Sequence, residues 1–128
     1  MAGQQFTKMK ISKNFSRAEF CCQCSEGCQA DTVDAQLLTI LEEVRARFGP
    51  VTITSGCRCA KHNKAVGGAE HSQHLLGRAA DFTVKGVEAS TIQGFLQARY
   101  PTTLGLGIGS KEFTHLDTRR NRARWHYS

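Results

Sequence analysis

The 128-residue chain contains no hydrophobic run long enough to span a membrane, and it has no internal repeat or low-complexity tract. Residues 1–13 are polar with only scattered apolar side chains, so the apolar core of a secretion signal is missing. We therefore expect a protein that is synthesised in a cytoplasm without a signal peptide and has no membrane span. Hydrophobic residues make up 40% of the chain, which is enough to build one folded domain at this length.

Signatures of nucleic-acid binding are also missing, although the net charge is +6. No helix-turn-helix or RNA-binding motif is present, and no stacking aromatic side chains alternate with the arginines of residues 119–124. Basic charge favours anionic partners in general, among them teichoic acids, lipopolysaccharide and peptidoglycan. The sequence therefore argues against nucleic acid as the partner, and a solvated basic tail is the commoner interpretation of such a run.

Six cysteines are many for a chain of this length. They form an early cluster and a later pair: Cys21, Cys22, Cys24 and Cys28, then Cys57 and Cys59. Cysteine-rich cytoplasmic chains tend to bind metal or keep free thiols, whereas exported ones form disulfides. The C-C-x-C-x3-C and C-x-C spacings are not a standard zinc-finger pattern, so disulfides, free thiols and a second, structural metal all stay open.

Two helices are predicted from apolar periodicity. Asp31 and Asp34 resemble a helix start, and apolar side chains recur at helical spacing over residues 37–48 before a Gly-Pro pair. A second helix is marked by the apolar side chains of residues 92–100 and is ended by a proline. Residues 60–77 are rich in glycine, histidine and asparagine, which predicts a loop with short helical pieces.

Four strands are predicted over residues 51–54, 79–84, 104–109 and 113–117. In residues 104–109 aliphatic side chains alternate with glycine, so one face of the strand is bare and would let a substrate or another backbone approach closely. Helices and antiparallel-capable strands joined by short loops predict an α+β fold, a small single domain with an antiparallel sheet flanked by helices. We place an N-terminal extension at residues 1–14 and the domain at residues 15–128.

The stretch between residues 55 and 81 carries the residue types of a metal site. His74 and Asp81 are seven residues apart with Gly77 between them, so a loop ligand and a strand ligand could converge. His115, on the last predicted strand, could supply a third ligand. Imidazole and carboxylate groups suit zinc, and a catalytic zinc keeps three protein ligands with an open position for water. The H-E-x-x-H motif is absent, and a pairing of His71 with His74 is an alternative, although His71 is interpreted more simply as a polar loop residue.

Residues 55–81 contain, in order, S-G-C-R, H-N, G-G and S-x-H-x-x-G-x-A-x-D, and residues 113–117 are F-T-H-L-D. In these motifs the chain resembles the zinc D-alanyl-D-alanine carboxypeptidase family, which includes phage L-alanyl-D-glutamate endolysins and shares the hedgehog/DD-peptidase fold. The similarity extends over residues 15–125. It implies a zinc-dependent peptidase that hydrolyses peptide bonds of peptidoglycan, with zinc held by His74, Asp81 and His115.

The resemblance also implies where the substrate is bound. Arg58 matches the arginine that the family uses beside the substrate, where a guanidinium can pair with a carboxylate or polarise a carbonyl, and Ser72 of the same motif is expected to contact the substrate too. A structural ion pair is the alternative role for Arg58. Cys57 stands where the family usually has an aromatic residue, so substrate contacts are expected to differ there. The two cysteines that flank Arg58 could also pair with the early cluster and fix this arginine.

Two carboxylates are candidates for the catalytic base. Glu112 precedes His115 by three residues, like the Glu/Asp-x-x-His arrangement of several family members. On a regular strand residues three apart face opposite sides, whereas Asp117, two residues after His115, shares its face. Glu112 is preferred on the condition that it lies at a bend before the strand. Asp117 is then expected to orient a metal ligand or Arg58.

The peptide bond that is cut stays open among D-Ala-D-Ala, L-Ala-D-Glu and cross-bridge bonds, because the shape of the pocket sets specificity. We expect a monomer that acts in the periplasm or at the cell wall, released during phage lysis or carried on a virion. One other hypothesis is a non-catalytic, zinc-containing cell-wall-binding module of the same fold. Another is a cysteine-rich nucleic-acid protein that binds a structural metal through the early cysteines.

Overall fold

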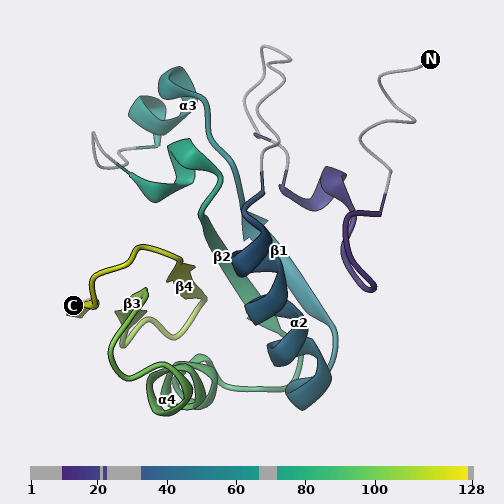
Figure 1. The fold of residues 1–128 in the computed structure, drawn as a ribbon, viewed down its shortest axis with the longest axis vertical. Helices are drawn as coiled ribbons and strands as arrows, with labels where there is room; N and C mark the ends of the chain where they lie inside the picture. The colour runs from purple at the N-terminus through teal and green to yellow at the C-terminus, as the bar shows by residue number, and fades with distance from the viewer. Residues whose placement is uncertain (1–9, 21, 23–32, 67–71, 127–128) are drawn as a thin grey trace.

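The computed structural model describes residues 10–20, 22, 33–66 and 72–126 (Figure 1). Its helices and strands are η1 (Arg17–Phe20), α2 (Ala35–Phe48), β1 (Val51–Ser55), α3 (Ala60–Ala65), η2 (Gln73–Leu76), β2 (Ala79–Val84), α4 (Ala89–Arg99), β3 (Gly105–Ile108), β4 (Thr114–Asp117) and β5 (Ala123–His126). The two η elements are single turns of 3-10 helix. Several predictions fall outside the described residues, namely those on residues 1–9, Cys21, Cys24, Cys28, Asp31 and His71.

The strands form one five-stranded sheet in the order β1-β2-β4-β3-β5. Strands β1 and β2, β2 and β4, and β3 and β4 pair antiparallel, whereas β3 and β5 pair parallel. The predicted α+β class is confirmed, and the sheet is mixed where a wholly antiparallel one was predicted. The difference comes from β5, an edge strand of four residues that are only partly buried or exposed, which is too short to stand out in the sequence.

Helix α2 forms where the sequence predicts it, because its apolar residues lie on one face. The buried residues of that face are Leu37, Ile40, Leu41 and Val44. Asp34 caps the helix, since its Oδ2 accepts the backbone N–H of Leu37 at 3.1 Å. The same oxygen accepts the Thr118 hydroxyl at 2.9 Å, which joins the start of the helix to the end of β4. The cap therefore also fixes α2 against the sheet.

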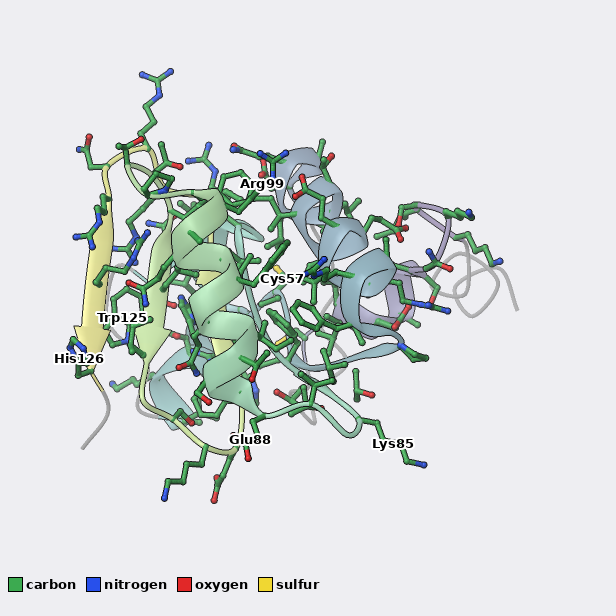
Figure 2. All side chains as sticks on the ribbon, turned by 90° about the horizontal axis from the view of Figure 1, so that it is seen from below. Cys57, Lys85, Glu88, Arg99, Trp125 and His126 are labelled. Atoms are coloured by element: carbon green, nitrogen blue, oxygen red, sulfur yellow. The ribbon has the colours of Figure 1, made fainter. Side chains whose placement is uncertain are left out.

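Helices α2 and α4 lie side by side on one face of the sheet (Figure 2). Edge-to-face packing of Phe48 on Phe95, with ring centroids 5.3 Å apart, and a 2.6 Å hydrogen bond from the Tyr100 hydroxyl to Glu43 connect them. From the sheet, Phe82 and Leu116 are fully buried in this core. Because side chains alternate along a strand, the residues between these core positions point to the other face. That second face carries the candidate site.

The chain just before the predicted domain boundary also packs on α2. The Glu42 carboxylate accepts the Ser12 hydroxyl at 2.6 Å, and the backbone and side-chain nitrogens of Asn14 at 2.8 and 2.7 Å. Phe15 follows, 1% exposed. Within the described part of the chain, no helix has the length and apolar character needed to cross a membrane.

Candidate metal centre

The three predicted metal ligands come together on the sheet face opposite α2 and α4. Asp81 of β2 and His115 of β4 are direct cross-strand partners, and His74 reaches them from η2. The Asp81 Oδ1 atom lies 2.8 Å from His115 Nδ1 and 3.4 Å from His74 Nε2. One ligand atom from each residue lies within 4.8 Å of the other two, so the three could hold one metal ion. His74 is 2% exposed and His115 9%, which keeps both rings in a fixed environment.

The second nitrogen of each imidazole is held by an oxygen acceptor. His74 Nδ1 lies 2.7 Å from the carbonyl oxygen of Gly56, and His115 Nε2 lies 2.9 Å from Asp117 Oδ2. A carbonyl and an ionised carboxylate can only accept, so these two nitrogens carry the hydrogens. His74 Nε2 and His115 Nδ1, the other pair, both face Asp81. Metal-binding histidines are oriented in this way, and the donor set of two imidazoles and one carboxylate fits zinc.

Asp117 is fully buried behind His115, and both of its carboxylate oxygens accept hydrogen bonds. Arg119 donates Nε to Asp117 Oδ1 and Nη2 to Oδ2, both at 2.7 Å. The guanidinium of Arg119 lies 5.3 Å from the centroid of the Trp125 ring, and that ring lies 5.0 Å from the ring of His115. Trp125 belongs to the edge strand β5 (Figure 2). These contacts hold the His115 ring in place. We call the three side chains that make them, Asp117, Arg119 and Trp125, the support of His115.

Glycine at position 105 makes room for this support. A Cβ on Gly105 would lie 2.6 Å from Asp117 Cγ and closer still to both carboxylate oxygens. The glycine face of this strand was predicted to let a substrate or another backbone approach closely; at Gly105 the group that approaches is the Asp117 side chain instead. Cross-strand pairing of Gly105 with Asp117 explains why the contact occurs here.

The charges of the centre stabilise one another. Burial acts to raise the pKa of Asp81, but hydrogen bonds and charge from His115 and His74 outweigh it and hold the pKa far below its usual range. Burial likewise acts to raise the pKa of Asp117, and His115 and Arg119 lower it far more. For His115, burial acts to lower the pKa, yet the two carboxylates that it contacts raise it. Asp81 is therefore ionised, which is the form in which a carboxylate binds a metal ion.

Arg58 lies at the edge of the centre. Its Nη2 is 3.6 Å from Asp81 Oδ2, while its Nε donates to Ser55 Oγ and its Nη1 to Asn63 Oδ1, both at 3.2 Å. Asn63 is 4% exposed, so it provides a fixed acceptor. The guanidinium is thus aimed at the metal cluster while two neutral acceptors hold it. The alternative role predicted for Arg58 was a structural ion pair. The contact that corresponds to it is the one with Asp81, at 3.6 Å.

Ser72 and Glu112 occupy different positions relative to the cluster. The Ser72 hydroxyl accepts the backbone N–H of His74 at 3.2 Å and caps η2, which orients the histidine. Glu112 is exposed and lies in the bend before β4, the condition under which it was preferred as base. Buried Gln93 of α4 holds that bend, since it accepts Gly109 N–H at 3.0 Å and donates to Ser110 O at 3.2 Å. Within the described residues the Glu112 carboxylate has no hydrogen bond or ion pair.

Sequence reasoning assigned no role in the site to four residues that support the centre: Asn63, Gln93, Arg119 and Trp125. Asn63 had only its place in the motif as a signal, and Arg119 was grouped with the solvated basic run. Arg119 and Trp125 act through ring and ion-pair contacts across a turn, which no spacing in the sequence indicates. Gln93 lies within the second predicted helix, where a polar side chain by itself indicates no role.

The chain matches a known protein family. A family model described as Peptidase M15 matches residues 13–117. The matched range includes the three clustered ligands as well as Arg58, Glu112 and Asp117. A search of curated proteins finds no match. Because the matched range spans well over half of the chain, the chain belongs to the Peptidase M15 family.

Proposed function

We propose that this Peptidase M15 chain is a zinc-dependent peptidase that hydrolyses peptide bonds in the stem peptides or cross-links of peptidoglycan. The single observation that carries the proposal is the geometry of His74, Asp81 and His115. Each imidazole has one nitrogen bound to an acceptor and the other directed to the same carboxylate. Membership of a zinc-dependent peptidase family and the ordered cell-wall-peptidase motif around His74 support the choice of metal and substrate.

Zinc held by these three residues would lower the pKa of a bound water and polarise the scissile carbonyl. We assign the proton transfer to Glu112, because its carboxylate is exposed and without a partner among the described residues. Asp117 is unsuited to this task, since its two oxygens are occupied by Arg119 and His115 inside the fold. A general base must accept a proton and deliver it to the leaving amine, which a saturated and strongly ionised carboxylate does poorly.

We assign Arg58 to the binding of a carbonyl or carboxylate group of the substrate. Its neutral partners Ser55 and Asn63 leave its charge largely uncompensated, and its only described carboxylate contact is the 3.6 Å approach to Asp81. A guanidinium positioned in this way can orient a carbonyl for attack and stabilise negative charge that develops on it. Ser72 is proposed to contribute to substrate binding through the loop that it caps.

An arginine-lined hollow near the centre suits an acidic peptide. It has a volume of about 470 Å³ and lies where β2 begins and β4 ends, with Arg78, Arg119 and Arg120 in its wall. Stem peptides of peptidoglycan carry free carboxylates, which the guanidiniums of Arg78 and Arg120 can bind, whereas Arg119 is paired with Asp117. We expect Arg78→Ala to raise KM for cell-wall substrate with little change in kcat, and an unchanged KM would remove the hollow from the substrate path.

The proposal is tested by digesting purified peptidoglycan and identifying the fragments by mass spectrometry. The zinc-loaded protein should release fragments with new peptide termini, whereas chelated protein and the His115→Ala variant should release none. Glu112→Gln should keep its zinc and lose about 10²–10⁴-fold in turnover. Near-normal turnover in Glu112→Gln would refute the assignment of the base alone. Zinc-loaded protein that binds cell walls yet cuts no muropeptide would refute the peptidase and favour the non-catalytic binding module.

The masses also identify the bond, which decides between carboxypeptidase and endopeptidase. Loss of a terminal D-alanine indicates a D,D-carboxypeptidase, and cleavage within the stem or cross-link indicates an endopeptidase. A role in phage or prophage lysis is part of the proposal, because the resemblance includes phage endolysins. It predicts that external addition lyses cells only after their outer barrier is permeabilised.

A further inference from the structure

A pair of cysteines far apart in the sequence meets beside the Arg58 loop. Cys22 Sγ and Cys59 Sγ lie 3.8 Å apart, although 37 residues separate them along the chain. Each sulfur also accepts a backbone hydrogen bond: Cys59 N–H donates to Cys22 Sγ at 3.3 Å, and His62 N–H donates to Cys59 Sγ at 3.4 Å. Cys22 is 8% exposed and Cys59 is partly buried, and neither is in a disulfide.

The distance between the two sulfurs matches a shared metal ion. A disulfide places its sulfurs at about 2.05 Å, far shorter than the separation here. Two sulfurs that bind one tetrahedral zinc at about 2.3 Å each stand about 3.8 Å apart, because a tetrahedron's edge is 1.63 times its centre-to-corner distance. We propose that Cys22 and Cys59 are two ligands of a structural zinc ion, separate from the His74, Asp81 and His115 centre.

The position of the pair indicates what this ion would hold together. Cys22 follows η1 closely, and the Phe20 carbonyl just before it accepts the Cys57 N–H at 2.8 Å. Gly56, which precedes Cys57, also lies against Phe20. A Cβ on Gly56 would lie 2.6 Å from Phe20 Cα, so the Arg58 loop and the end of η1 touch backbone to backbone. Cys59 directly follows Arg58. A zinc at the sulfurs would therefore fasten the substrate-facing arginine loop to η1.

The same loop connects the two proposed zinc sites. The Gly56 carbonyl accepts the His74 ring hydrogen, and Arg58 N–H donates to the His74 carbonyl at 2.9 Å. A structural zinc contributes folding free energy directly, since its ligands converge only in the folded chain. Loss of this ion should therefore loosen the loop that positions both Arg58 and His74.

Zinc stoichiometry of the full chain, purified with a thiol reductant, tests the proposal. We expect two zinc ions per chain in the unaltered protein and one in His74→Ala. Replacement of zinc by cobalt in His74→Ala should give a sulfur-to-cobalt charge-transfer absorption, which Cys22→Ser and Cys59→Ser should each abolish.

A second measurement covers the case in which the serine variants fail to fold. In folded His74→Ala, stepwise blocking of thiols with a mercurial should release the remaining zinc as the thiols react, and the melting temperature should fall with it. One zinc per reduced, unaltered chain, lost altogether in His74→Ala, would overturn the proposal. So would a His74→Ala protein whose cobalt spectrum lacks the sulfur absorption, or a disulfide between Cys22 and Cys59 in peptide maps of the native protein. None of these outcomes depends on peptidase activity, so they are separable from a failure of the proposed function.

Discussion

Replacement of Gly105 by alanine should report sharply on the support behind the metal ligands. The added methyl would overlap the Asp117 carboxylate, with the Cβ 2.6 Å from Asp117 Cγ. That carboxylate is fully buried and binds both His115 and Arg119, so it cannot turn away without breaking these bonds. The perturbation thus reaches His115 through Asp117 while leaving every metal ligand in the sequence.

The expected loss follows from the role of Asp117. Removing the partner that orients a metal-binding histidine typically weakens metal affinity about 10–100-fold. That range corresponds to about 1.4–2.7 kcal/mol of binding free energy. Gly94→Ala is the matched control, because a Cβ there has no atom within 4 Å and the residue lies within α4. The control should gain about 0.5–1 kcal/mol in stability and keep its zinc affinity.

Zinc affinity of both variants can be measured by competition with a chromophoric chelator, scoring only the ion that His74→Ala removes. Urea unfolding and circular dichroism show whether each variant is folded. A folded Gly105→Ala protein that binds this zinc as tightly as the unaltered chain would refute the role assigned to Asp117. A loss of similar size in Gly94→Ala would show that the affinity reports general destabilisation instead.

Three further predictions concern Arg58 and the contacts of α2. Arg58→Lys should lower kcat/KM about 10²–10³-fold, nearly as much as Arg58→Ala, because lysine keeps the charge but lacks the planar fork; recovery by lysine would contradict a directional role. Burial acts to raise the pKa of Glu42, but hydrogen bonds from Ser12 and Asn14 lower it overall. The advantage of the unaltered chain over Glu42→Gln in urea unfolding should therefore be complete above pH 4.5 and shrink as the pH falls below it; an advantage that does not depend on pH would contradict this. Burial and Glu43 raise the pKa of Tyr100 to about 12, so the cost of Tyr100→Phe, about 0.5–1.5 kcal/mol at neutral pH, should disappear as the pH rises from 10 through 12.

Local patterns in the sequence predicted most of the fold. The buried face of α2, the exact range of β2 and the end of α4 before Pro101 all follow from apolar spacing and chain breakers. The parallel strand β5 did not follow, because it is a four-residue edge strand that is held by its pairing with β3. Edge strands of this kind are set by the rest of the sheet.

The sequence predicted the part of the candidate site that lies within its motifs, namely the three clustered ligands. The convergence of His74 and Asp81 depends on one ordered motif, and cross-strand pairing places His115 beside them. The supporting contacts were beyond prediction, since the Asp117, Arg119 and Trp125 support needs the β4–β5 turn to bring it together. Gly105 shows the difference well: alternation predicted a bare face, but only the register of β3 and β4 shows that Asp117 fills it.

Crystals of the zinc-loaded protein, with anomalous diffraction recorded at the zinc edge, test the central claim most directly. An anomalous peak should lie about 2.0–2.2 Å from His74 Nε2, His115 Nδ1 and an Asp81 carboxylate oxygen. The Gly56 carbonyl and Asp117 should still hold the other two ring nitrogens. Absence of a peak between these three residues, or a peak bound through His74 Nδ1 or His115 Nε2, would contradict the account.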